Sequence, residues 1–166
     1  EGQRMQREKF LVFGAPLIEQ PEIDEVVDCL KSGWIGTGPR VARFEEQFRE
    51  YTGAGHALAL NSCTAALHLA FHALGVGPGD EVIVPSMTFV ATSNAAIHAG
   101  ATPILVDCDR HTMNIDPAAI QAAVTPRTRA IVVVHFAGRP CDMDPILAIA
   151  RKHDLRLVED CAHGIE

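Results

Sequence analysis

The sequence predicts an α/β fold with a mostly parallel sheet and helices on both faces. Segments with a helical period alternate along the chain with short apolar runs of strand length. These apolar runs are continuous rather than alternating, which is typical of strands buried on both faces. The helical segments between them are the connections that parallel strands require.

The predicted elements follow one another in a regular order. Pro21 stands near the first position of a helix that ends at Gly33. The other predicted helices cover residues 41–52, 64–75, 88–100, 116–124 and 142–153. The five predicted strands cover residues 56–60, 81–85, 102–107, 129–136 and 155–160. Residues 1–12 are predicted to form a polar leader, which is a candidate for disorder, ahead of a domain over residues 13–166.

The composition excludes several classes of protein. A net charge of −7 without a Lys/Arg cluster argues against a nucleic-acid binder. No apolar run approaches the ~20 residues that span a membrane. The five cysteines form no CxxC pair, which is typical of reduced thiols in a cytoplasmic protein. We therefore expect a cytoplasmic protein that binds neither nucleic acid nor membrane.

Candidate binding residues follow the predicted strands, because chemistry in such sheets gathers beyond the carboxyl ends of the strands. Ser62 and Thr64 open a helix whose free backbone N–H groups suit a phosphate, although an ordinary helix cap explains the same residues. Phe89 follows another strand and either stacks on a flat ring or belongs to the core. For His135 we favour a hydrogen bond to a loop over direct chemistry.

The last predicted strand ends in two carboxylates, Glu159 and Asp160. Neighbouring side chains on a strand point to opposite faces, so only one of the two can face a given site. A buried carboxylate needs a partner, which a protonated ring nitrogen or the N-terminus of a following helix would supply. His163 is close enough in sequence to reach the same ligand.

A metal site is not expected. His68 and His72 are four residues apart and share a helix face. The intervening residues lack the glutamate of an HExxH motif, and no third ligand is evident.

Six stretches together resemble one enzyme family. They are SGWIGTGPRVARFEEQF, ALNSCTAALHLA, GDEVIVPSMTFVATSNAA, GATPILVDCD, VVVHFAGRPCDMD and LVEDCAHG, in order from about Phe13 to Gly164. The chain resembles the DegT-type sugar aminotransferases, which are pyridoxal-phosphate (PLP) enzymes of the aspartate aminotransferase fold. The resemblance implies that residues 13–166 form the N-terminal part of the PLP-binding large domain, without its C-terminal part and the small domain.

The resemblance also implies roles for single residues. Asp160 matches the carboxylate that pairs with the pyridine nitrogen, and Phe89 matches the residue stacked on the ring. Cys63 and Thr64 match the phosphate-binding turn, and His163 the position near the phenolic oxygen. Trp34, Gly36 and Thr37 match a loop near the substrate and the dimer partner.

The implied reaction moves an amino group from glutamate, through PLP, to a keto-sugar attached to a nucleotide. The HFAG and DCAH motifs favour 4-keto sugars of surface polysaccharides as substrates. The family also implies a homodimer. The catalytic lysine of the family, which forms the Schiff base, follows the EDxAH motif. Lys9, Lys31 and Lys152 do not match it, so we expect this chain alone to be inactive, with an unpaired sheet edge covered by a dimer or swapped contact.

Two other functions remain open. A PLP-dependent sugar dehydratase of the same family carries histidine in place of the lysine, and the residue at that position separates the two enzymes. A catalytically silent module that binds a partner or regulates is the third interpretation. It requires the coding sequence to stop at Glu166.

Overall fold

The computed structural model of the protein describes residues 14–165. The predicted polar leader, residues 1–12, lies outside the described residues. The contacts divide the chain after Ala57 into two compact units, and each unit is described by itself.

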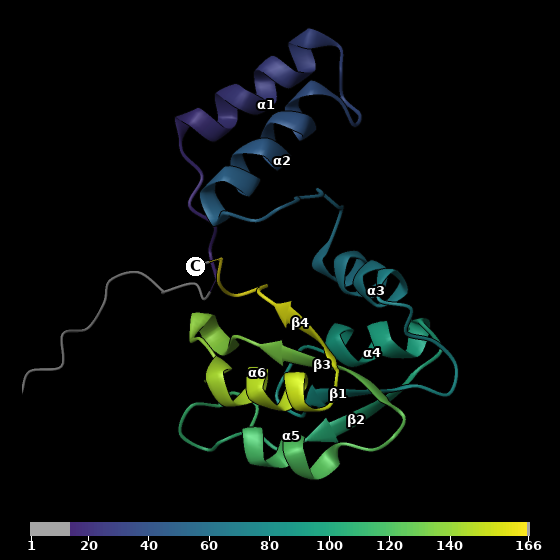
Figure 1. The fold of residues 1–166 in the computed structure, drawn as a ribbon. Coiled ribbons are helices and arrows are strands. Elements are labelled where there is room, and N and C mark those ends of the chain that lie inside the picture. The colour runs from purple at the N-terminus through teal and green to yellow at the C-terminus, as the bar shows by residue number, and fades with distance from the viewer. Residues whose placement is uncertain (1–13, 166) are drawn as a thin grey trace, which may run out of the picture. The chain divides into compact units, whose positions relative to one another are not determined.

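In the first unit, the described residues form two helices, α1 (Gln20–Ser32) and α2 (Pro39–Thr52) (Figure 1). Helix α1 ends at Gly33, whose φ of 72° is a left-handed conformation that glycine adopts without strain. Helix α2 begins two residues before its predicted start because Pro39 suits the first turn of a helix. Glu25 on α1 pairs with Arg40 on α2 at 2.6 Å, which links the two helices.

The second unit is built on a parallel sheet. Its strands are β1 (Glu81–Pro85), β2 (Thr102–Val106), β3 (Thr128–Val134) and β4 (Arg156–Asp160), in the order β2-β1-β3-β4. All three strand pairings are parallel. The helices are α3 (Cys63–Ala73), α4 (Ala91–His98), α5 (Pro117–Ala123) and α6 (Met143–Lys152), with a short 3-10 turn, η1 (Phe136–Gly138). The predicted α/β fold with a parallel sheet is confirmed.

The predicted strand at residues 56–60 is wrong. This segment belongs to no strand of the sheet, and Leu58 and Leu60 are 74% and 40% exposed. A short apolar run does not specify a strand by itself, because an extended segment is stabilised only by hydrogen bonds to a neighbouring strand. The described residues therefore contain four strands rather than five.

Helices cover both faces of the sheet, as predicted (Figure 1). Val82 and Val84 of β1 pack with residues of α3 and α4 in one apolar cluster. Ile83, between them, packs with residues of α5 and α6 in a second cluster on the opposite face. The alternation of side chains along the strand thus places one continuous apolar run in two cores.

Helix α4 is shorter than predicted, since residues 88–90 belong to the loop after β1 rather than to the helix. This difference places Thr88 and Phe89 at the carboxyl edge of the sheet. Within residues 14–165, no helix has both the length and the apolar character needed to cross a membrane.

Candidate functional site

Three segments of the second unit meet at the carboxyl edge of the sheet. Asp160 is the last residue of β4 and is buried, with 5% of its surface exposed. Its Oδ1 lies 3.6 Å from Sγ of Cys63 at the start of α3. Its Oδ2 accepts a 2.9 Å hydrogen bond from Oγ1 of Thr92 in α4. The fold therefore brings Asp160 to residues 97 and 68 positions away in the sequence.

The two carboxylates at the end of β4 lie in different surroundings, as the alternation along a strand predicts. Glu159 is exposed, and its Oε2 lies 3.0 Å from Nε2 of His135. Asp160 is buried and also accepts the backbone N–H of Ala162 at 3.2 Å. Residues 161–165 include a turn and no helix, so among the described residues Asp160 caps a turn rather than a helix.

The start of α3 combines a helix cap with free donors. Ser62 Oγ accepts the backbone N–H of Ala65 at 3.1 Å, so the predicted cap is confirmed. Within the described part of the chain, no hydrogen-bond partner is found for the N–H groups of Cys63 and Thr64. Such groups at a helix N-terminus attract anions, so the cap leaves the predicted phosphate site possible.

The thiols beside Asp160 are held in their neutral form. The pKa of Cys63 is raised, first by desolvation of the sulfur and then by the negative charge of Asp160. Burial also raises the pKa of Cys161, and the charges of Glu159 and Asp160 add to the effect. Because thiolates are the reactive form, these cysteines are poor nucleophiles near neutral pH.

Phe89 does not belong to the core. It is 75% exposed, which contradicts the interpretation as a core phenylalanine. Its carbonyl oxygen accepts the N–H of Thr92 at 3.1 Å, so its backbone is tied to the residue that contacts Asp160. An exposed aromatic ring is thus attached to the loop that borders the carboxylate.

His163 contacts the loop after β3 rather than Asp160. Its Nδ1 accepts the backbone N–H of Ala137 at 3.2 Å, and its ring meets Phe136 edge-on at 6.1 Å. Since Nδ1 accepts, the proton of the neutral ring resides on Nε2, and the side chain is exposed.

The predicted loop contact of His135 is confirmed. Its Nδ1 accepts the backbone N–H of Cys141 at 3.1 Å. The Nε2 atom therefore carries the proton that faces Glu159. This histidine holds a loop and an exposed carboxylate together.

Sequence analysis did not identify two threonines at this edge. Thr92 is fully buried, and its Oγ1 lies 2.7 Å from Oγ1 of Thr88. A signal was present, because Thr92 shares its helix with the buried residues Ala91, Ala95 and Ala96. A hydroxyl among buried alanines needs a polar partner.

Asn114 was also missed. It is 4% exposed, and its Nδ2 donates to the carbonyl oxygens of Arg139 and Pro140 at 3.0 and 2.9 Å. Its Oδ1 accepts the N–H of Phe136 at 3.0 Å. Asn114 therefore anchors the loop that His163 contacts.

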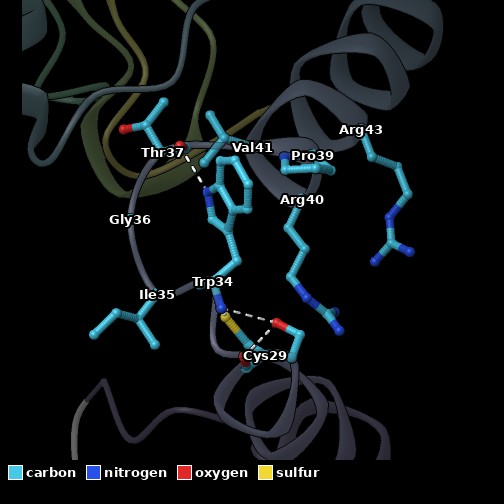
Figure 2. A pocket seen from close by; sticks show the side chains of 10 residues that line it. Cys29, Trp34, Ile35, Gly36, Thr37, Pro39, Arg40, Val41 and Arg43 are labelled. Carbon is cyan, nitrogen blue, oxygen red and sulfur yellow. Dashed lines mark hydrogen bonds between the residues drawn. The ribbon is translucent and has the colours of Figure 1, made fainter.

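The first unit brings Trp34, Gly36 and Thr37 together in one hollow of about 820 Å³. Figure 2 shows the indole of Trp34 directed at Thr37, whose carbonyl oxygen accepts Nε1–H at 3.0 Å. The thiol of Cys29 donates to the carbonyl oxygen of Trp34 at 3.2 Å. A Cβ atom at Gly36 would meet no atom within 4 Å, so this glycine borders open space.

The histidine pair of α3 shares one helix face, as its spacing predicts. Nε2 of His68 lies 3.1 Å from Nε2 of His72. Residues 14–165 contain no group of three His, Cys, Asp or Glu side chains placed to hold a metal ion.

Lys152 lies away from Asp160. It is the last residue of α6, and its Nζ lies 3.4 Å from Oε1 of Gln121 on α5. Helix α6 leads into the amino end of β4, whereas Asp160 stands at the carboxyl end. Lys31 is in the last turn of α1, and Lys9 lies outside the described residues.

Known proteins share this arrangement of sequence and fold. Residues 16–166 match the DegT/DnrJ/EryC1/StrS aminotransferase family. The chain belongs to this family. The resemblance seen in the sequence motifs is thereby confirmed over nearly the whole chain.

Two relatives show which functions occur among similar members of the family. The chain is 55% identical over 159 residues to the spore coat polysaccharide biosynthesis protein SpsC of Bacillus subtilis, covering 96% of this chain and 41% of that protein. It is 49% identical over 152 residues to GDP-perosamine synthase of Caulobacter vibrioides, covering 91% and 41%. The chain thus spans about two fifths of the length of these relatives.

Solved structures agree with the fold. The chain is 42% identical to 3-amino-5-hydroxybenzoic acid synthase with a TM-score of 0.88, over 96% of this chain and 41% of that one. It is 36% identical to NtdA of Bacillus subtilis with bound cofactor PMP, with a TM-score of 0.86, over 96% and 39%. PMP is pyridoxamine phosphate, the aminated form of PLP.

Proposed function

We propose that this chain supplies part of the PLP site of a nucleotide-sugar aminotransferase. The proposed donor is glutamate, and the proposed acceptor is a nucleotide-linked 4-keto-sugar used in surface polysaccharide or amino-sugar synthesis. Membership of the family and the likeness to GDP-perosamine synthase and SpsC support this substrate class. The five free cysteines support a reducing, cytoplasmic location for a protein that we propose to act as a homodimer.

The observation that carries the proposal is a buried carboxylate without a cation. Asp160 accepts hydrogens from Thr92, Ala162 and Cys63, all of which are neutral donors. No ion pair among residues 14–165 involves Asp160. Because an isolated buried charge is costly, a cationic N–H from a bound molecule would stabilise it. A protonated pyridine ring is such a group.

The surrounding residues fit the rest of the cofactor. The N–H groups of Cys63 and Thr64, with the Thr64 hydroxyl, would hold the phosphate at the start of α3. The exposed ring of Phe89 would cover one face of the pyridine. His163 would direct its Nε2–H towards the phenolic oxygen. The loop of Trp34, Gly36 and Thr37 would contact the substrate or the dimer partner.

PLP, when bound, supplies a ring that withdraws electrons from the carbon bearing the amino group. Asp160 would keep the proton on the ring nitrogen, which increases that withdrawal. Lys152 lies at the opposite end of β4, so it is not placed to serve as the catalytic lysine. We therefore propose that this chain binds cofactor without completing transamination by itself.

Fluorescence titration with PMP and with pyridoxamine tests the cofactor site. PMP needs no covalent bond to lysine, so its binding reports the residues of this chain. We expect PMP to bind at least about tenfold more tightly than unphosphorylated pyridoxamine, since the start of α3 recognises the phosphate. Replacement of Thr64 by Val should narrow this difference. Absence of saturable PMP binding would contradict the proposal.

Mass spectrometry after incubation with PLP and borohydride tests the role of the lysines. We expect the mass to remain that of the 17.9 kDa chain, without a PLP adduct. A specific adduct on Lys152 or Lys31 would show that a lysine of this chain forms a Schiff base with PLP. In equilibrium dialysis, the PMP-loaded chain should bind a nucleotide-linked 4-keto-sugar more tightly than its 3-keto isomer.

A further inference from the structure

Two threonines form a chain of hydroxyl groups that ends on Asp160. Thr88 Oγ1 lies 2.7 Å from Thr92 Oγ1, and Thr92 Oγ1 lies 2.9 Å from Asp160 Oδ2. Thr92 is fully buried, Asp160 is 5% exposed, and Thr88 is half-buried. The hydroxyl chain is therefore shielded from water along most of its length.

The direction of the two hydrogen bonds follows from the groups involved. A carboxylate oxygen only accepts, so Thr92 donates its single hydroxyl proton to Asp160. Thr92 then has no proton left for Thr88, and Thr88 must donate to Thr92. All protons in this chain of hydroxyls thus point towards the carboxylate.

The hydrogen bonds that Asp160 accepts show which of its two oxygens can take a further donor. Oδ1 of Asp160 faces two donors, the N–H of Ala162 at 3.2 Å and the thiol of Cys63 at 3.6 Å. Oδ2 accepts from Thr92 alone. Since each carboxylate oxygen has about two acceptor positions, the vacant position is on Oδ2, beside the Thr92 hydroxyl.

We propose that Thr92 is a positioning residue that aims Oδ2 of Asp160 at the cationic ring nitrogen of PLP or PMP. This inference rests on the proposed function. Thr88 fixes the direction of the Thr92 hydroxyl and stands next to Phe89 in the same loop. The hydroxyl chain therefore connects the loop of Phe89, which we propose covers the ring face, to Asp160, which we propose pairs with the ring nitrogen.

Four variants separate positioning from simple packing. Thr92→Val removes the hydroxyl and keeps the branched shape, whereas Thr92→Ser keeps the hydroxyl and loses only a methyl group. Thr128→Val is the matched control, because Thr128 is also buried (6% exposed) but stands at the amino end of β3. Thr88→Val changes a half-buried position and tests the same hydroxyl chain if Thr92→Val does not fold.

PMP titration and ¹⁵N NMR of labelled PMP measure the effect on the ligand. We expect Thr92→Val to bind PMP about tenfold more weakly, as loss of a hydrogen bond to a charged group predicts. The pyridine ¹⁵N signal should move towards that of the unprotonated ring. Thr92→Ser and Thr128→Val should resemble the wild-type chain, and Thr88→Val should weaken binding about two- to threefold.

A measurement on the ligand-free chain keeps this inference separate from the proposed function. The ¹³Cγ signal of Asp160 at neutral pH should shift in Thr92→Val and return in Thr92→Ser. An unchanged ¹³Cγ signal in Thr92→Val would overturn the positioning role, whether or not PMP binds. A shifted signal with wild-type PMP affinity and pyridine ¹⁵N signal would also overturn it. Failure of the wild-type chain to bind PMP would instead refute the cofactor site.

Discussion

Replacement of Asp160 by Asn should separate cofactor binding from stability. The carboxylate accepts a hydroxyl proton from Thr92 at 2.9 Å and an N–H from Ala162 at 3.2 Å. An asparagine that turns its oxygen to Ala162 presents its NH₂ group to Thr92. The Thr92 hydroxyl can then accept this hydrogen and donate to Thr88, which reverses the hydroxyl chain. The second N–H of this amide points to the position that we propose for the ring nitrogen.

The expected magnitudes follow from these contacts. A hydrogen bond to a charged group contributes about 1.5–3 kcal/mol, and a neutral one about 0.5–1.5 kcal/mol. Two bonds that lose charge assistance cost roughly 2 kcal/mol, which is offset because the variant no longer buries a charge. We expect the free energy of unfolding to change by less than about 1 kcal/mol. PMP loses its charged partner, so its affinity should fall roughly ten- to a hundredfold.

Urea unfolding and fluorescence titration with PMP measure the two quantities on the same preparation. Asp116→Asn serves as the control, because Asp116 also accepts a backbone N–H, from Ala118 at 2.8 Å, and the variant changes the net charge equally. PMP affinity within twofold of the wild-type value in Asp160→Asn would refute the pairing with the ring nitrogen. A loss of stability above about 3 kcal/mol would show that the carboxylate is needed for folding.

Three further predictions concern stability in urea unfolding experiments. Hydrogen bonds from Thr125 and Arg127 hold the pKa of Glu81 below its ordinary value, so its stabilisation is present above about pH 4.3 and is lost as the pH falls through the lowered pKa. Glu81→Gln should flatten this acid dependence. Burial raises the pKa of Cys141 to about 11. The neutral thiol therefore stabilises the fold below about pH 8.5, and this contribution to the free energy of unfolding is lost as the pH rises towards 11. Cys141→Ala should remove this loss of stability at alkaline pH. Phe71 is fully buried, and Phe71→Ala should cost about 3–5 kcal/mol, whereas a cost below 1 kcal/mol would show that the core closes around the cavity.

The sequence predicted the strands whose apolar side chains pack into the clusters on both faces of the sheet. The run EVIVP became β1, whose five residues are all buried. The run HALAL at residues 56–60 has a similar apolar content, yet it forms no strand in the described chain. The two runs differ in their partners, because EVIVP pairs with β2 and β3 whereas HALAL pairs with no strand among the described residues. The local sequence pattern does not encode such long-range partners.

The site could be predicted at the level of segments but not of contacts. The positions of Asp160, Cys63 and Phe89 at strand ends and a helix start indicated one edge of the sheet. The contacts of Thr92 and Asn114 could not be read from spacing, because they depend on which buried atoms lie within hydrogen-bond distance. A polar residue on an otherwise apolar helix face is the usable signal for such partners.

Among the described residues of the second unit, two carboxylates are buried, and their surroundings differ. Glu81, at the amino end of β1, is 4% exposed and pairs with Arg127, whose guanidinium neutralises it. Asp160, at the carboxyl end of β4, is 5% exposed and contacts neutral donors only, within the residues that the structure describes. At Glu81, an arginine of the chain itself compensates the buried charge. The absence of a cationic partner for Asp160 among residues 14–165 therefore supports our proposal that a bound molecule supplies the positive charge.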